Sequence, residues 1–172
     1  MHITEIANSA ASSSSISAAM LSKDDSRYAV MMTEDWQFIH VDPASAAKTA
    51  FGGTVAHGFL TLSMLVAMAH DGLPDIEGRV MGVNYGFDKI RFVTPVPSGS
   101  RVRARFKLIE VTARGAKEFM TRSEVVVEID GSDKPALVAE WLGVSYLAET
   151  VAIQVPPGPP DPVRLPDAFS IR

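Results

Sequence analysis

The stretch AHGFLTLSMLVAMAH, residues 56–70, constrains the fold of this chain more than any other feature of its sequence. It contains no proline, meets its first charge only at Asp71, and is followed by Gly72 and Pro74, which commonly end a helix. Because apolar residues occur nearly all round it, the pattern predicts one helix that is buried on every side. The other elements of this 172-residue chain must therefore wrap it.

The C-terminal half of the chain is predicted to supply this wrapping, because its apolar residues change to a period of two. Strands are expected near residues 79–93, 101–111, 118–129 and 136–147. Pro97-Ser98-Gly99 separates the first two, and Asp130-Gly131 is a hairpin turn signal between the last two. One long apolar helix followed by an antiparallel meander predicts an α+β domain whose sheet curls around the helix.

The two ends of the chain differ in composition from its centre. Residues 1–22 include the run ANSAASSSSISAA and are interpreted as a loose, low-complexity arm. The predicted domain covers residues 23–150; it begins with a short helix at 23–33 capped by Ser22 and has a second helical stretch at 43–50. Residues 151–172 are rich in proline and are interpreted as an extended tail.

Composition excludes several classes of function. The formal net charge of −4 offers no general basic surface for nucleic acid. The absence of cysteine excludes disulfides, thiolate nucleophiles and Cys-ligated zinc. The longest apolar run, about residues 58–69, is too short to cross a bilayer, and the N-terminal sequence lacks the pattern of a signal peptide. We therefore expect a cytoplasmic protein without membrane insertion.

Asp35 and His40 lie five residues apart in the segment EDWQFIHVD. If the intervening chain forms a turn, the carboxylate and the imidazole can converge on one water and act in general acid–base chemistry near neutral pH. On spacing alone, such a pair is more often an ordinary surface pair. His57, which lies further along the chain, is interpreted as a loop or structural histidine.

Gly58 lies where the apolar helix begins, after the sequence GGTVAH. Its backbone N–H has no partner within the helix and lies at the positive end of the helix dipole, which suits a developing oxyanion. Without a side chain, it also allows a ligand to approach the backbone closely. Taken alone, GGTVAHGF is nevertheless more typical of a plain glycine-rich loop.

Three motifs in order resemble the MaoC-like dehydratases, the (R)-specific enoyl-CoA hydratase family, and most of all its nodulation-protein-N-like branch. They are DWQFIHVDP (35–43), GGTVAHGFLTLS (52–63) and MGVNYGFDKIRFVTPVPSGSRVR (81–103). The resemblance implies a single hot-dog domain, an antiparallel sheet around the long apolar helix. A chain with one such domain is expected to form a homodimer, because its exposed edge strand needs a partner.

The family's motif, Asp-x-Asn-Pro-x-His, falls on this segment residue by residue. Its catalytic Asp matches Asp35 and its catalytic His matches His40. Gln37 stands at the position of the Asn and Phe38 at that of the Pro, which departs from the best-studied hydratases and resembles the nodulation-N-like branch.

The resemblance implies a hydro-lyase that adds water across a trans-2-enoyl thioester in fatty acid metabolism. The family's glycine, whose N–H binds the thioester oxygen, matches Gly58, while Asp35 and His40 would hold and deprotonate a water aimed at C3. Some relatives carry a serine on the buried helix, and Val66 stands there, so that role is not assigned. No metal or cofactor is implied, because CoA is part of the substrate.

Further residues are candidates for binding the rest of an acyl-CoA. Phe51, Phe59 and Met64 border the acyl chain or pack in the core. Asn84 and Tyr85 line the tunnel or satisfy buried backbone groups. A basic cluster faces the CoA phosphates or forms a solvated strand face: Lys89, Arg91, Arg101, Arg103 and Arg105. The candidate substrate-binding set is Gln37, Phe59, Asn84, Tyr85 and Arg91.

Two alternatives to the hydratase stay open. A hot-dog acyl-CoA thioesterase would direct water at the carbonyl carbon and release free CoA from a saturated substrate. A non-catalytic acyl-thioester-binding module would have no turnover to lose. The spacing of Asp35 and His40 favours the hydratase.

Overall fold

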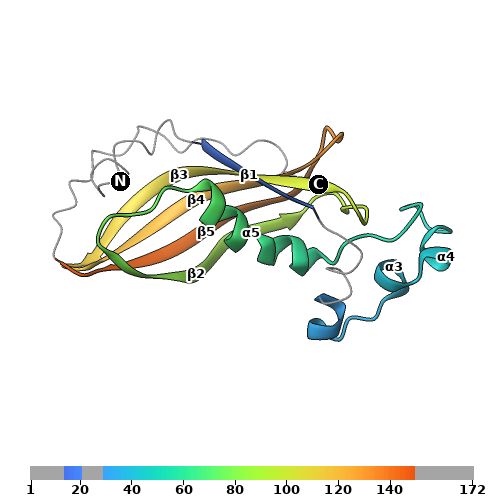
Figure 1. The fold of residues 1–172 in the computed structure, drawn as a ribbon, viewed down its shortest axis with the longest axis horizontal. Coiled ribbons are helices and arrows are strands. Elements are labelled where there is room, and N and C mark those ends of the chain that lie inside the picture. The colour runs from blue at the N-terminus through green and yellow to red at the C-terminus, as the bar shows by residue number, and fades with distance from the viewer. Residues whose placement is uncertain (1–13, 21–28, 150–172) are drawn as a thin grey trace.

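The computed structural model describes residues 14–20 and 29–149 (Figure 1). Residues 29–33 are helical, and three further helices follow: α3 (Phe38–Val41), α4 (Pro43–Ala46) and α5 (Gly58–Gly72). The strands are β1 (Ser14–Met20), β2 (Arg79–Phe92), β3 (Arg101–Gly115), β4 (Glu118–Ile129) and β5 (Pro135–Leu147). They form one antiparallel sheet in the order β1-β3-β4-β5-β2.

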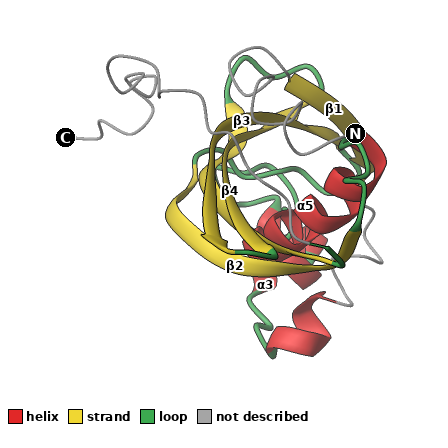
Figure 2. Cartoon of the chain, turned by 90° about the vertical axis from the view of Figure 1, so that its left-hand side faces the viewer, coloured by secondary structure: helices red, strands yellow, loops and turns green. Residues whose placement is uncertain are grey.

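The sheet curls around one side of α5 (Figure 2). Along β3, Val102, Ala104 and Phe106 are buried while the arginines between them reach solvent, as a period of two requires. These side chains pack with Leu65 and Met68 of α5 in the main hydrophobic core. The predicted α+β domain with an antiparallel sheet around a helix is confirmed, and four strands lie within a few residues of their predicted bounds.

Both predicted turns contain a glycine in the left-handed region of backbone space. Gly99, between β2 and β3, has φ of 88°, and Gly131, between β4 and β5, has φ of 76°. Residues with a Cβ are strained there, so glycine fixes these two reversals.

The prediction that α5 is buried on every side is wrong, because part of the helix is exposed in the single chain. Only Thr61, Leu65, Met68 and Ala69 are buried, while Phe59 is 62% exposed. The reason lies in the packing, because α5 contacts β1 and β3 and leaves a gap toward the other edge of the sheet. The apolar residues that face this gap remain uncovered.

The N-terminal arm contains a strand that its sequence does not suggest. Residues Ser14–Met20 pair antiparallel with β3, Ser14 opposite Lys107 and Met20 opposite Arg101. The interpretation as a loose arm is therefore wrong for this stretch. Its serines and alanines have low strand propensity, and the free edge of β3 supplies the partner that makes it a strand.

The helical stretch predicted at 43–50 is shorter in the structure. The Asp42 side chain caps α4 by accepting from the amides of Ala44 and Ser45, but the helix ends at Ala46 and turns follow. The Thr49 hydroxyl bonds to the Ala46 carbonyl at 2.7 Å, which competes with continued helix. The predicted Ser22 cap, residues 23–28 and the tail 151–172 lie outside the described residues.

Candidate active site

The segment that carries Asp35 and His40 lies beyond the N-terminal end of α5, outside the curl of the sheet (Figure 1). Glu34 has φ of 56°, a left-handed turn that ends the preceding helix and redirects the chain. Two hydrogen bonds attach the segment to the stretch before α5. The Val55 amide donates to the Ile39 carbonyl at 3.0 Å, and His40 Nδ1 lies 2.8 Å from the Val55 carbonyl.

His40 is oriented by this contact with the Val55 carbonyl. A carbonyl can only accept, so Nδ1 carries the proton and donates it. In the neutral ring, Nε2 then keeps a free lone pair. His40 is therefore set up to take a proton from water through Nε2.

The Asp35 carboxylate is held by three hydrogen-bond donors. His57 Nε2 lies 3.0 Å from Oδ2, the Gln37 amide donates to Oδ1 at 3.4 Å, and the Gln37 side chain reaches Oδ2 at 3.5 Å. Desolvation raises the pKa of Asp35, but the hydrogen bonds from the Gln37 amide and the His57 side chain outweigh it. The pKa consequently lies below its usual value, and Asp35 is a carboxylate at neutral pH.

His57 is the N-cap of α5 and is only 4% exposed. Its Nδ1 accepts from the Phe59 amide at 3.2 Å, and its carbonyl accepts from the amides of Leu60 and Thr61 at 3.0 and 3.3 Å. Because Nδ1 accepts, the neutral ring carries its proton on Nε2 and donates it to Asp35. His57, interpreted above as a loop or structural histidine, thus contacts a predicted catalytic residue directly.

Gly58 is the first residue of α5, and its amide precedes the internal hydrogen bonds of the helix. The next three amides all bond to His57, whereas none of the hydrogen bonds among the described residues uses the Gly58 amide. Phe92 lies beside it, since a Cβ built on Gly58 would come 3.3 Å from Phe92 Cε1. The amide is therefore a donor at the positive end of a helix dipole, bordered by an aromatic ring.

Asp35, His40 and His57 each offer one potential metal-ligand atom, and these atoms lie within 4.8 Å of one another. Two imidazoles and a carboxylate can also bind a metal ion. The hydrogen bonds of His57 indicate hydrogen bonding to Asp35 and not metal binding. His57 Nε2 carries a proton, so it has no lone pair to offer a metal while Nδ1 caps α5. In this tautomer, the three residues can act in proton transfer and hydrogen bonding.

A groove begins at Phe59, the residue after Gly58, and runs between α5 and the β2 and β5 side of the sheet. A cavity of about 600 Å³ begins at Phe59 and Ser63, and a second of about 1080 Å³ continues toward the C-terminal end of α5. Val66, Asn84 and Trp141 line both cavities. The groove is long and mostly apolar, as a site for an acyl chain requires.

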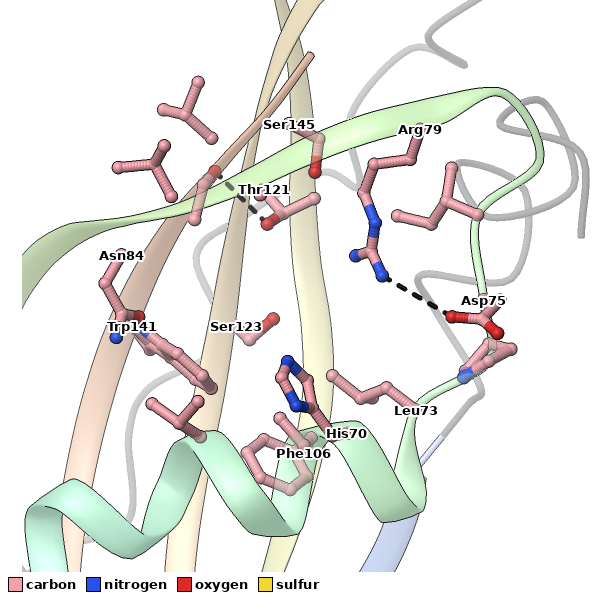
Figure 3. Close-up of a pocket in the computed structure, with 18 of the residues that line it drawn as sticks. His70, Leu73, Asp75, Arg79, Asn84, Phe106, Thr121, Ser123, Trp141 and Ser145 are labelled. Atoms are coloured by element: carbon pink, nitrogen blue, oxygen red, sulfur yellow. Dashed lines mark hydrogen bonds and ion pairs between the residues drawn. The ribbon is translucent and has the colours of Figure 1, made fainter. Parts of the chain in front are cut away.

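The far end of the groove is more polar (Figure 3). The hydroxyl residues Thr121, Ser123 and Ser145 line it, and Arg79 pairs with Asp75 at 3.6 Å at its rim. The groove therefore becomes more polar toward the C-terminal end of α5.

The remaining candidate substrate residues divide between the groove and the outer surface. Phe59 and Asn84 line the groove, and Gln37 contacts Asp35. Tyr85 lines neither cavity and lies under the Arg114 guanidinium, 4.9 Å from the ring centroid. Phe51 is 46% exposed, whereas Met64 packs against the core.

Three members of the predicted basic cluster pair with carboxylates on the sheet. Lys89 binds Glu140 at 2.9 Å, and Arg103 and Arg105 both bind Glu128. Arg91 donates to the Ile90 carbonyl at 2.8 Å and directly precedes Phe92, whose ring lies beside Gly58. This arrangement fits a charged strand face for Lys89, Arg103 and Arg105.

Sequence reasoning missed His57 and the groove residues Val66 and Trp141. A histidine directly before a helix stands at the N-cap position, and this is the signal that could have identified it. The contact between His57 and Asp35 joins residues 22 positions apart, so spacing in the sequence could not reveal this contact.

Among the described residues, no helix combines the length and apolarity needed to cross a membrane.

The chain is similar in sequence to proteins of one known family. Residues 7–129 match the family described as MaoC like domain. Nodulation protein N of Rhizobium leguminosarum bv. viciae is 54% identical over 113 residues, 65% of this chain and 70% of that protein. The 3-hydroxyacyl-thioester dehydratase Z of Mycobacterium tuberculosis is 46% identical over 116 residues, 67% and 76% of the two chains.

A solved structure supports the same fold. The (R)-hydratase from A. caviae involved in PHA biosynthesis aligns with a TM-score of 0.65 at 21% identity, over 76% of this chain and 92% of that one. The predicted hot-dog fold and the predicted resemblance to nodulation protein N are thereby confirmed. The chain belongs to the MaoC-like dehydratase family.

Proposed function

We propose that this protein is an (R)-specific hydro-lyase that interconverts a trans-2-enoyl-CoA and a 3-hydroxyacyl-CoA. The observation that carries the proposal is the cluster of an ionised Asp35 and the free Nε2 of His40 beside His57, the residue that precedes the Gly58 amide. Phe59, the next residue along, lines an apolar groove. Relatives named (R)-specific enoyl-CoA hydratase and 3-hydroxyacyl-thioester dehydratase Z support this class of reaction.

The reaction would begin with a water held between Asp35 and His40. His40 Nε2 takes one proton as the water oxygen bonds to C3, while the Asp35 carboxylate accepts a hydrogen bond from the other O–H. The C2–C3 double bond shifts its electrons toward the thioester carbonyl, and the Gly58 amide stabilises the resulting enolate oxygen. The proton on His40 then passes to C2, which completes the addition.

The thioester would enter at the aromatic pair Phe59 and Phe92, whose ring centroids lie 5.9 Å apart. Its acyl chain would extend along α5 past Val66 and Trp141. Asn84, which lines both cavities, would contact the chain at their junction. CoA is bound as part of the substrate, and the chemistry uses the residues named above without a metal or redox cofactor.

We further infer that the protein acts as a homodimer joined through β2. This strand is one of the two outer strands of the sheet and pairs only with β5 among the described strands. Val80, Met81, Val83 and Tyr85 are each more than 40% exposed along it. A second copy would pair with this edge and cover the apolar face of α5 that one chain leaves open. A cytoplasmic location stays a prediction.

The assay that tests the function follows two products at once. Loss of enoyl absorbance reports hydration of crotonyl-CoA or a longer enoyl-CoA, and a thiol reagent reports CoA release from saturated acyl-CoA. We expect hydration without thiol release, and a fall of orders of magnitude in Asp35→Asn and His40→Ala. Thiol release would identify a thioesterase, and binding without any turnover would identify a non-catalytic acyl-binding module.

A further inference from the structure

His57 uses both of its ring nitrogens, and each contacts a different part of the candidate site. Nδ1 accepts from the Phe59 amide at 3.2 Å, and Nε2 donates to Asp35 Oδ2 at 3.0 Å. The ring is almost fully buried and lies against two other rings, those of His40 at 5.1 Å and Phe59 at 5.9 Å between centroids. Such a ring has little freedom to rotate.

Histidine is an unusual choice for a helix N-cap. Serine, threonine, asparagine and aspartate are the preferred residues, because a short side chain can reach back to the amides of the first turn. At position 57 the imidazole performs this capping and also reaches Asp35, 22 residues earlier in the sequence. The second contact explains why a longer, two-ended side chain occupies the cap.

We propose that His57 is a positioning residue that fixes the Asp35 carboxylate relative to the Gly58 amide. This inference rests on the proposed hydratase function, in which both groups contact the substrate or its water. One rigid ring joins the start of α5, where the amide lies, to the carboxylate of the separate segment 34–41. The geometry between the water and the thioester oxygen would thus depend on this ring.

The ring would also set the charge state of Asp35. The titratable groups around this carboxylate are His57, His40 and the adjacent Glu34. Hydrogen bonds from the Gln37 amide and His57 lower the pKa of Asp35. Without His57, the pKa of Asp35 rises, and the carboxylate is lost at a higher pH on acidification.

His57→Asn separates the two contacts. Asparagine is a good N-cap and can still accept from the Phe59 amide, but its side chain is too short to reach Asp35 as well. We expect kcat to fall by about 10- to 100-fold with little change in KM, because the carboxylate loses its fixed position relative to the Gly58 amide. His57→Gln, whose longer amide can donate to Asp35, should recover part of kcat.

Asp42→Asn is the matched control, because Asp42 caps the neighbouring helix α4 and has no part in the proposed chemistry. It should leave kcat and KM unchanged. If His57→Asn also leaves both unchanged at an unaltered unfolding temperature, His57 is only a helix cap and the proposal fails.

Nuclear magnetic resonance tests the same link without turnover. In the full-length protein, the His57 ring nitrogens should report a neutral ring protonated at Nε2, and the Asp35 carboxyl should titrate at a higher pH in His57→Asn than in the wild type. A ring protonated at Nδ1, or an unmoved Asp35 titration, would overturn the proposal. An inactive wild type with these signals present would overturn the hydratase function and leave the link intact.

Discussion

At the scale of single residues, the groups that we propose to react come from two segments joined by a few hydrogen bonds. His40 is oriented by the Val55 carbonyl, and Asp35 is held by His57. Val55 and His57 lie within three residues of Gly58. The same short stretch therefore orients the proposed acid–base pair and carries the proposed oxyanion donor. Preorganised groups of this kind lower the cost of reaching the transition state.

Gly58→Ala tests the close approach of a ligand to the helix N-terminus. The added Cβ would lie 3.3 Å from Phe92 Cε1, and Phe92 is 48% exposed and able to move aside. We expect the unfolding free energy to change by less than about 1 kcal/mol, while kcat/KM for an enoyl-CoA falls by roughly 100-fold.

The double variant Gly58→Ala with Phe92→Leu distinguishes two causes of this loss. Leucine relieves the contact with the new methyl group but leaves that group in the path of the thioester oxygen. We therefore expect the double variant to stay as slow as Gly58→Ala. Recovery of kcat/KM would mean that the glycine serves only to make room for Phe92.

The sequence indicated Asp35, His40 and Gly58 because their motifs are contiguous and their residue types suit the chemistry. His57 lies inside one of those motifs, yet its role depends on the folded path of residues 34–41, which no local pattern specifies. The pairing of Arg103 and Arg105 with Glu128 likewise arises from strand register, which sequence alone did not provide.

At the scale of elements, α5 contributes one face to the core and another to the groove. Leu65 and Met68 are buried against the sheet, whereas Val66 lines both cavities at their junction. The period-two strands 101–115 and 118–129 were predictable because alternation records which face is buried. The open face of α5 was not predictable from the sequence. An apolar residue in a sequence does not reveal whether a sheet or a second subunit covers its side chain.

Val66→Phe should shorten the usable groove. A larger ring at the junction of the two cavities would block the passage of a long acyl chain but leave the space near Gly58 open. We expect kcat/KM to fall by about tenfold or more, ~1.4 kcal/mol, for a long-chain enoyl-CoA and to change little for crotonyl-CoA.

Ala67→Phe is the matched control on the same helix. Ala67 is exposed and lines neither cavity. Equal losses for both chain lengths in Val66→Phe, or the same selectivity in Ala67→Phe, would contradict the assignment of the groove to the acyl chain.

At the scale of the whole molecule, a single chain leaves many large apolar side chains exposed to solvent. The exposed apolar side chains lie along β2, on the open face of α5 and on the segment that carries Asp35, where Trp36 is 62% exposed. Specific dimers bury about 1,200–2,000 Å² in total, and exposed apolar patches are typical of such interfaces.

Val80→Lys with Val83→Lys should convert the dimer to a monomer. Across a two-fold axis each lysine faces the same strand of the partner, so like charges meet at the edge where strands would pair. Light scattering during size-exclusion chromatography should show a mass near twice 18.5 kDa for the wild type and near 18.5 kDa for the variant.

Ile109→Lys provides the control, since Ile109 is 39% exposed on β3, away from the β2 edge. It should elute and scatter as the wild type does. A wild type that is monomeric at micromolar concentration would contradict the proposed dimer.

The proposed function is one reaction, so identifying the product of that reaction tests it most directly. Purified protein would be incubated with a trans-2-enoyl-CoA in D₂O, and the product would be analysed by chiral chromatography and mass spectrometry. We predict an (R)-3-hydroxyacyl-CoA that carries one solvent deuterium at C2. Unchanged enoyl-CoA at every chain length, or free CoA in place of the hydroxyacyl thioester, would contradict the hydratase function.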